Sequence, residues 1–223
     1  MGMPDKGLQP PRLIVVEGPI GVGKTSLVQR LAHSLGCASL LEDPDDNPFL
    51  ERFYQDPRGA AFATQLHFLF QRSKQLEGLR QGDLFAGRGL VADFLFAKDR
   101  LFAELTLDRH ELALYDQVYS RLSMEAPRPD LVVYLQAPVP VLLQRIRRRN
   151  RRAEQTLDPG YLQRLADAYT EFFYHYDQSP LLIVNAAEIN PVDRDADYQL
   201  LLERICRAGP GKHYFNPAPL DLS

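Results

Sequence analysis

The stretch "GPIGVGKT", residues 18–25, decides the fold that the sequence predicts. It fits the pattern G-x-x-x-x-G-K-[ST], in which a glycine-rich loop turns its backbone N–H groups toward phosphate oxygens. The apolar run "RLIVVEG" (12–18) leads into the loop, and "TSLVQRLAHSL" (25–35) leaves it with helical spacing. Because this strand–loop–helix order is the context that the motif requires, the sequence predicts a P-loop that binds a nucleoside triphosphate.

The residues of the loop divide the work of holding the triphosphate and a metal ion. Lys24 is placed to reach the β- and γ-phosphates, and the Thr25 hydroxyl is placed to bind Mg²⁺. ATP and Mg²⁺ are therefore the expected ligands. The expected triphosphate-binding residues are Gly18, Gly21, Val22, Gly23, Lys24, Thr25 and Ser26.

Short apolar segments alternate with longer periodic ones over the whole chain. Near-continuous apolar strands are typical of a parallel sheet that is covered on both faces. Strands are expected at 12–18, 38–43, 89–93, 130–137 and 181–186. Helices are expected at 24–35, 48–55, 60–81, 97–107, 110–124, 138–150, 159–177 and near 194–208. The prediction is an α/β fold with a five-stranded parallel sheet flanked by helices, in a single domain of residues 1–223 with flexible tails at 1–11 and 209–223.

Composition limits the class of protein. The chain has 223 residues, 45% hydrophobic and 25% charged, with a net charge of −3. Its apolar runs are far shorter than a membrane span, and "MGMPDKGLQPP" (1–11) has no apolar signal region. Its two cysteines are no disulfide framework. We therefore expect a cytoplasmic protein that does not interact with membranes.

The segment "QRIRRRNRRAE", residues 144–154, carries six arginines. Arg145 and Arg149 are four positions apart on one face of an expected helix, and Arg151 falls just past its end. Guanidinium groups placed in this way suit the oxygens of a γ-phosphoryl group, so we expect an arginine-rich lid over about 145–157. A solvated arginine helix is the plain alternative, and it is sufficient for Arg147, Arg148 and Arg152. No nucleic-acid polymer is expected as a partner, because the rest of the chain is acidic.

Several ordered motifs give the chain a resemblance to a known family. They are "LLEDPDDNPFLERFYQD" (40–56), "AAFATQLHFLFQRSKQL" (60–76), "RIRRRNRRAE" (145–154) and "FFYHYDQSPLLIVNA" (172–186). Together they resemble the deoxynucleoside kinases, in particular the bacterial deoxyadenosine/deoxyguanosine kinase type. The resemblance implies a P-loop kinase fold, ATP- and Mg²⁺-dependent phosphorylation of the 5′-hydroxyl of a deoxynucleoside, and a homodimer.

The resemblance also implies the roles of single residues. Glu42 stands at the position of the general base for the 5′-hydroxyl, at the end of a strand expected next to the P-loop strand. The other expected catalytic residues are Lys24, Arg145, Arg149 and Arg151. The expected substrate contacts are Tyr54 and Glu154 at the sugar 3′-hydroxyl, Phe62 and Gln65 at the base, and Arg72 beneath the base and the 5′ end. For Phe62 a place in the hydrophobic core stays open as the alternative, because an aromatic on a helix is more often a core residue.

The chain departs from the family after the third strand, in "VADFLFAKDRLFA" (91–103). Asp93 is present and is expected near Mg²⁺ and the substrate, since a carboxylate is a hard oxygen ligand. Phe94 and Leu95, however, stand where the family has Arg and Ser, and the segment is one residue shorter. Lys98 and Arg100 are the two candidates to replace the missing arginine, and the sequence leaves this choice open. Asp99 is matched to the family's base-reading aspartate.

Two alternative functions stay open at this point. A thymidylate-kinase-like nucleotide kinase shares the P-loop and the lid, but its acceptor carries a phosphate and needs a further cation. A catalytically weakened nucleotide-binding regulatory protein is motivated by the missing arginine. The sequence also leaves open the preferred base and any feedback control.

Overall fold

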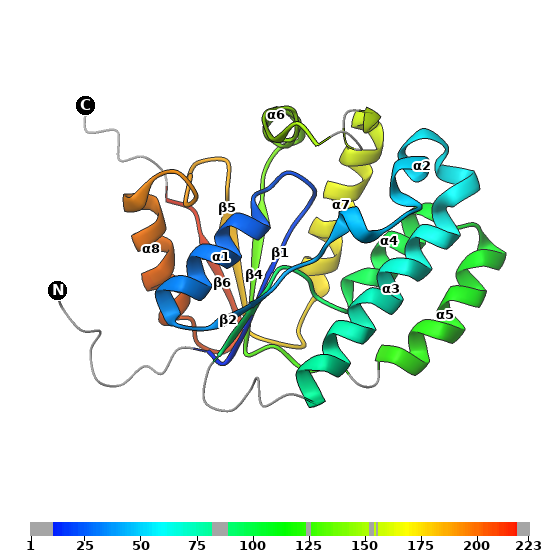
Figure 1. Cartoon of the computed structure of the whole chain (residues 1–223). Coiled ribbons are helices and arrows are strands. Elements are labelled where there is room, and N and C mark those ends of the chain that lie inside the picture. The colour runs from blue at the N-terminus through cyan, green and yellow to red at the C-terminus, as the bar shows by residue number, and fades with distance from the viewer. Residues whose placement is uncertain (1–10, 82–88, 124–125, 152–153, 155, 218–223) are drawn as a thin grey trace.

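A computed structural model describes residues 11–81, 89–123, 126–151, 154 and 156–217 of the chain. Its centre is a parallel sheet of six strands in the order β2-β3-β1-β4-β5-β6 (Figure 1). The strands are β1 (Leu13–Glu17), β2 (Ala38–Leu40), β3 (Leu90–Ala92), β4 (Leu131–Gln136), β5 (Leu181–Asn185) and β6 (Lys212–Phe215). The α/β parallel architecture predicted from the alternation of segments is therefore confirmed.

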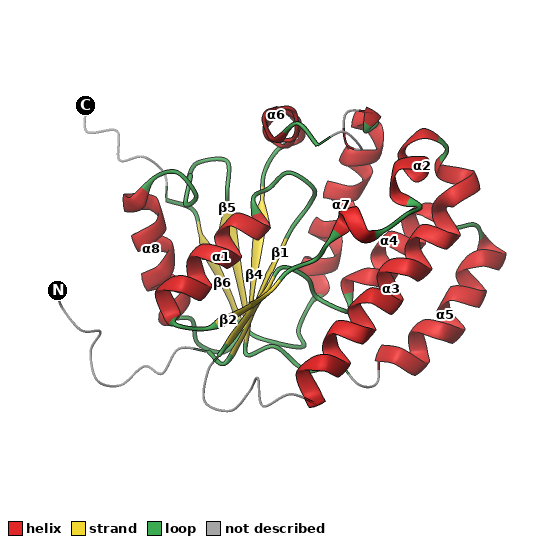
Figure 2. Cartoon of the chain, viewed as in Figure 1, coloured by secondary structure: helices red, strands yellow, loops and turns green. Residues whose placement is uncertain are grey.

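Helices cover both faces of the sheet, which Figure 2 shows as separate red layers around the yellow strands. The helices α1 and α8 lie on one side, and α7 lies on the other with α4, α3 and α5 stacked beyond it. Among the described residues the helices are α1 (Lys24–Leu35), α2 (Leu50–Gln55), α3 (Pro57–Gln81), α4 (Lys98–Thr106), α5 (Arg109–Ser123), α6 (Val139–Arg149), α7 (Pro159–His175) and α8 (Asp195–Cys206).

The helices begin and end at the residues that local chemistry favours. Asp158 caps α7 by accepting hydrogen bonds from the backbone N–H groups of Gly160 and Tyr161, and Pro159 occupies the first helical position. Asn150 ends α6 in the left-handed conformation, with φ 55°. The arginine-rich helix therefore stops where the sequence predicts it.

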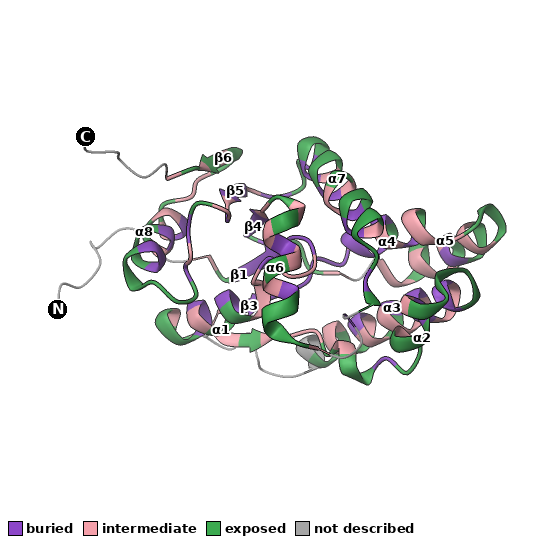
Figure 3. Cartoon of the chain, turned by 90° about the horizontal axis from the view of Figure 1, so that it is seen from above, coloured by how far each residue is buried: buried purple, intermediate pink, exposed green. Residues whose placement is uncertain are grey.

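The core is built from the central strands. Every residue of β1 and β3 is buried, and so are the first five residues of β4. Figure 3 looks down on the molecule with α6 lying across the central strands, and the buried segments lie beneath and beside that helix. Since strands covered on both faces have no solvent side, their side chains are apolar throughout. No helix in the described parts of the chain is long and apolar enough to cross a membrane.

Two expectations about the sheet are corrected. The sheet has six strands instead of five, because Lys212–Phe215 in the expected C-terminal tail pairs with β5 as an edge strand. Its alternate residues are half-buried and exposed, so it lacks the continuous apolar run of the other strands. In addition, β3 lies between β2 and β1, so the strand before Glu42 does not adjoin the P-loop strand. Residues 1–10 and 218–223 of the expected tails lie outside the described residues.

Candidate functional site

The P-loop connects β1 to α1 at the carboxyl edge of the sheet. Gly23, with φ 107°, precedes the first residue of α1, which is Lys24. The Lys24 ammonium donates hydrogen bonds to the carbonyl oxygens of Gly18, at 2.7 Å, and of Pro19, at 3.4 Å. Burial, and then the neighbouring Lys98 ammonium, lower the pKa of Lys24 below its ordinary value. The loop thus holds its lysine folded back over its own backbone, where it can face a bound anion.

Two hollows meet at this loop. The first, here called the central cavity, has a volume of about 110 Å³ and lies between the P-loop, α3, α4 and the segment after α6. The second, here called the P-loop groove, has a volume of about 400 Å³ and lies between the P-loop, α6 and the loop after β5. Gly21, Lys24, Thr25 and Arg149 line both hollows. A ligand in the groove and a ligand in the cavity would therefore meet at Lys24.

Most of the residues expected at the site line the central cavity. They are Lys24, Thr25, Glu42, Tyr54, Gln65, Arg72, Asp93, Arg149, Arg151 and Glu154. The P-loop residues from Gly21 to Ser26 line the groove, together with Arg145. Phe62 lies elsewhere: it packs against the cluster of Leu69, Phe96 and Tyr115 between α3, α4 and α5. Phe68, six residues further along α3, is the aromatic of that helix that lines the cavity.

Glu42 lies two residues past the end of β2 and is held by two cations. Arg72 donates to its Oε1 through Nε, at 2.5 Å, and through Nη2. The Lys98 ammonium lies 3.6 Å from the same oxygen. Burial alone would raise the pKa of Glu42, but Arg72, Lys98 and Lys24 outweigh it and lower this pKa to about 2. Among the residues that the structure describes, the hydrogen bonds and ion pairs of the Glu42 side chain end on Oε1, so Oε2 is the oxygen that we expect to contact a hydroxyl.

Asp93 and Thr25 bring two hard oxygen ligands together beside the P-loop. The Thr25 hydroxyl donates to Asp93 Oδ2 at 2.8 Å, and the backbone N–H of Glu42 donates to Asp93 Oδ1 at 2.7 Å. Burial raises the pKa of Asp93 above its ordinary value. A hydroxyl and a carboxylate at one position suit Mg²⁺, which prefers oxygen ligands. The residues present therefore fit the metal ion that the motif implies.

The central cavity is also lined by the polar groups of Tyr54, Gln65 and Glu154. Glu154 Oε1 accepts a hydrogen bond from Arg149, while Glu154 Oε2 is buried without a partner among the described residues. Burial, then Tyr161 and Glu154, raise the pKa of Tyr54, so its phenol remains a donor at neutral pH. The Gln65 amide donates to the Thr106 hydroxyl at 3.3 Å. These groups can read hydroxyls and a base edge.

The arginines of the run divide between the two hollows. The Arg145 guanidinium donates to the carbonyl oxygens of Val22, at 3.1 Å, and Ala186, at 2.8 Å, so it ties the P-loop to the end of β5. Arg149 pairs with Glu154, and Arg151 lies 4.0 Å from Asp45. Both face the central cavity. Arg152, and residues 153 and 155 of the expected lid, lie outside the described residues.

Two charged residues at the site were not assigned a role from the sequence. Glu17 and Lys98 are 0% and 2% exposed, and their charged groups lie 3.3 Å apart. Glu17 could have been singled out from the sequence, because it is a charged residue at the end of an otherwise apolar strand and immediately precedes Gly18. Lys98 was one of two open candidates, and the structure places it in the cavity lining.

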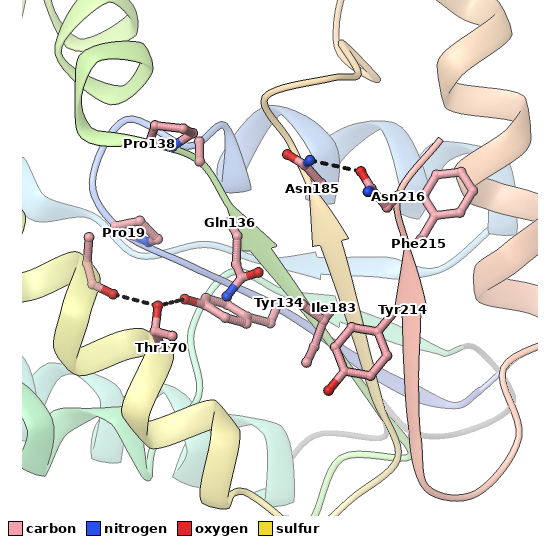
Figure 4. A pocket seen from close by; sticks show the side chains of 12 residues that line it. Pro19, Tyr134, Gln136, Pro138, Thr170, Ile183, Asn185, Tyr214, Phe215 and Asn216 are labelled. Carbon is pink, nitrogen blue, oxygen red and sulfur yellow. Dashed lines mark hydrogen bonds between the residues drawn. The ribbon is translucent and has the colours of Figure 1, made fainter. Parts of the chain in front are cut away.

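A further cavity of about 410 Å³ lies across the sheet from the groove, between α7 and the strands β4, β5 and β6 (Figure 4). Its polar side chains include Gln136, Asn185 and Asn216, and the Asn185 amide donates to the Asn216 oxygen at 2.9 Å. Its lining holds no charged side chain among the described residues. Because a triphosphate needs cations, this cavity is not the phosphate site.

The close packing of the P-loop against α6 gives a testable prediction. Gly21 has φ 85°, and a Cβ atom there would lie 2.6 Å from Ile146 Cγ1 and 2.9 Å from the Leu142 carbonyl oxygen. Gly21→Ala therefore adds backbone strain and a clash, which we expect to cost at least about 2 kcal/mol of stability. Thermal unfolding should show a midpoint roughly 4–8 °C lower for a chain of this size.

Gly209→Ala is the matched control, because no atom lies within 4 Å of the added Cβ. An equal loss of thermal stability in the two variants would contradict the assigned packing of Gly21 against α6.

Comparisons with known proteins agree with this geometry. The sequence model of the family "Deoxynucleoside kinase" matches residues 14–208. A deoxyguanosine kinase of Bacillus subtilis (strain 168) is 37% identical over 156 residues, which cover 70% of this chain and 75% of that protein. A deoxyguanosine kinase of Lactobacillus acidophilus is 32% identical over 204 residues, covering 86% and 89%. The solved structure of deoxyadenosine kinase from M. mycoides with bound dATP shares the fold, with a TM-score of 0.75, 24% identity and coverage of 87% and 98%.

Proposed function

Because the chain belongs to the deoxynucleoside kinase family, we propose that it transfers the γ-phosphoryl group of ATP to the 5′-hydroxyl of deoxyguanosine or deoxyadenosine. The observation that carries the proposal is that the central cavity and the P-loop groove meet at Lys24 and Thr25. The Glu42 carboxylate lines the central cavity and does not line the groove. The purine preference rests on the names of the relatives, which include deoxyguanosine and deoxyadenosine kinases.

In this proposal the donor lies in the P-loop groove. The backbone N–H groups of the loop and the N-terminus of α1 face its phosphates, and Lys24 neutralises charge that develops on the leaving diphosphate. Arg149 and Arg151 face the γ-phosphoryl oxygens from the cavity side, where planar guanidinium groups can bind them in pairs. Arg145 supports this arrangement by fixing the Val22 carbonyl and with it the loop.

Thr25 and Asp93 would hold Mg²⁺. When bound, the ion supplies positive charge to the β- and γ-phosphate oxygens. The carboxylate of Asp93 is oriented for this role by the N–H of Glu42, which fixes its second oxygen.

The acceptor lies in the central cavity. Tyr54 and Glu154 bind the sugar 3′-hydroxyl, and the Gln65 amide binds the base edge. Glu42 Oε2 accepts the hydrogen bond of the 5′-hydroxyl and aligns it with the γ-phosphorus. A carboxylate with a pKa of about 2 is a weak proton acceptor, so alignment is the larger part of its role. A loose transition state needs little proton abstraction before the phosphoryl group is transferred.

The charges around the acceptor favour a nucleoside over a nucleotide. Arg72 already contacts Glu42 and Asp99, and Lys98 lies beside Glu17 and Glu42. A phosphorylated acceptor would need a further cation to bind its phosphate. Arg72 and Lys98 are already paired with carboxylates, so neither is left to bind that phosphate. This speaks against a thymidylate-kinase-like activity.

A coupled assay of ADP release, with ATP and Mg²⁺, tests the proposal. The panel consists of the four common deoxynucleosides and their 5′-monophosphates. We expect the highest kcat/KM with deoxyguanosine or deoxyadenosine, and no turnover of the monophosphates. Turnover of the monophosphates alone would replace the proposal with a nucleotide kinase, and ATP binding without transfer to any nucleoside would support a regulatory protein. The homodimer and the cytoplasmic location remain predictions, and light scattering on the purified chain tests the first.

A further inference from the structure

Glu17 and Lys98 form a buried ion pair beside the residues of the proposed mechanism. Glu17 Oε1 accepts a hydrogen bond from the Leu95 N–H at 2.6 Å, and its Oε2 accepts from the Gly18 N–H and the Tyr169 hydroxyl, each at 3.0 Å. Both oxygens are thus fixed by the P-loop, the segment after β3, and α7. Buried charges are costly unless they are paired, so a pair at the bottom of a cavity needs a reason.

The Lys98 ammonium connects this fixed carboxylate to the site. It lies 3.3 Å from Glu17 Oε1 and 3.6 Å from Glu42 Oε1, and it lines the central cavity. Glu17 therefore determines where the ammonium lies, and the ammonium in turn faces the Glu42 oxygen that Arg72 also contacts. Because both cations contact Oε1 of Glu42, they hold this carboxylate in an orientation in which Oε2 can contact a ligand.

The geometry also separates Lys98 from Arg100, the other candidate of the same helix. Residues two positions apart on a helix point to different faces. Lys98 is the first residue of α4 and points to the strand ends, whereas Arg100 pairs with Glu104 and Asp116 at the surface.

We infer that Lys98 is a positioning residue for phosphoryl transfer: anchored by Glu17, it holds the Glu42 carboxylate in the orientation that aligns the acceptor hydroxyl. This inference rests on the proposed function. It explains how a chain with Phe94 and Leu95 after Asp93 keeps a second cation, besides Arg72, beside the Glu42 carboxylate. Misalignment of a reacting group by about 1 Å can lower the rate roughly 100-fold, so we expect the loss of the Lys98 ammonium to lower kcat.

Four variants test the role: Lys98→Met, Glu17→Gln, the double variant Glu17→Gln/Lys98→Met, and Arg100→Met as the matched cation control. We expect Lys98→Met to lower kcat with deoxynucleoside by about 10- to 100-fold, with the KM for ATP nearly unchanged. Arg100→Met should leave kcat unchanged. The double variant removes both charges of the pair, so it should fold even if Lys98→Met is destabilised by the unpaired Glu17.

The double variant distinguishes positioning from structural support. If Lys98 positions Glu42, kcat of the double variant stays at least about 10-fold below that of Glu17→Gln alone. Equal kcat values for these two proteins would overturn the inference, because Lys98 would then only neutralise Glu17. If the unmodified chain phosphorylates no deoxynucleoside, the proposed function fails and the inference fails with it. If the unmodified chain is active and kcat of the double variant equals that of Glu17→Gln, only the inference is overturned.

Discussion

Lys24→Ala is expected to lower kcat/KM for phosphoryl transfer by about 100- to 1,000-fold, the range found when one preorganised charge-stabilising donor is removed. Lys24 begins α1 and lines both the groove and the cavity, so it is placed at the junction where the phosphoryl group would pass. In the structure its ammonium contacts only backbone carbonyl oxygens of the P-loop among the described hydrogen-bond acceptors. The variant therefore breaks no ion pair, and we expect its thermal unfolding midpoint to be unchanged.

Steady-state kinetics with ATP and the preferred deoxynucleoside measure the effect, and thermal unfolding checks the fold. Lys74→Ala is the control, because Lys74 is an exposed lysine of α3. A Lys24→Ala protein that retains activity within tenfold of the unmodified chain would show that transfer does not take place at the P-loop.

Glu42→Gln is expected to lower kcat by about 100-fold, toward the lower end of what a positioned acid–base group contributes. The glutamine keeps the size of the side chain but removes the charge that, in the proposed mechanism, orients the 5′-hydroxyl. We expect the variant to fold, because the two cations that contact Glu42 each retain another carboxylate partner. Arg72 remains paired with Asp99, and Lys98 remains paired with Glu17. ATP binding should change little, since the Glu42 side chain lines the cavity and not the P-loop groove.

The measurement is kcat with saturating deoxynucleoside, together with the dissociation constant of Mg-ATP from calorimetric titration. Glu51→Gln, at an exposed position in the first turn of α2, serves as the control. An unchanged kcat in Glu42→Gln would refute the role of this carboxylate, and a large loss of ATP affinity would place it on the donor side.

Much of the site could be predicted because its residues occur in short local patterns. The P-loop is one continuous stretch whose glycines, lysine and threonine have predictable roles, and in the structure Lys24 and Thr25 line the central cavity, with Thr25 in contact with Asp93. The spacing of Arg145 and Arg149 on α6 likewise followed from helical periodicity. Phe62 was placed at the base from the resemblance alone. It lies in a helix–helix contact, because the face of α3 that meets the cavity is decided by how α3 packs on α4 and α5.

The sequence by itself determined the elements of this protein, since strand, loop and helix signals depend on neighbours along the chain. It predicted the parallel α/β fold, the anion-binding loop and the end of the arginine helix at Asn150. Only the tertiary structure decided the strand order, with β3 between β2 and β1, and the edge strand β6, whose pairing with β5 no local pattern announces. It also decided between Lys98 and Arg100, because which cation reaches a carboxylate some fifty or more residues away depends on the packing of α4 against the strand ends and not on spacing in the chain.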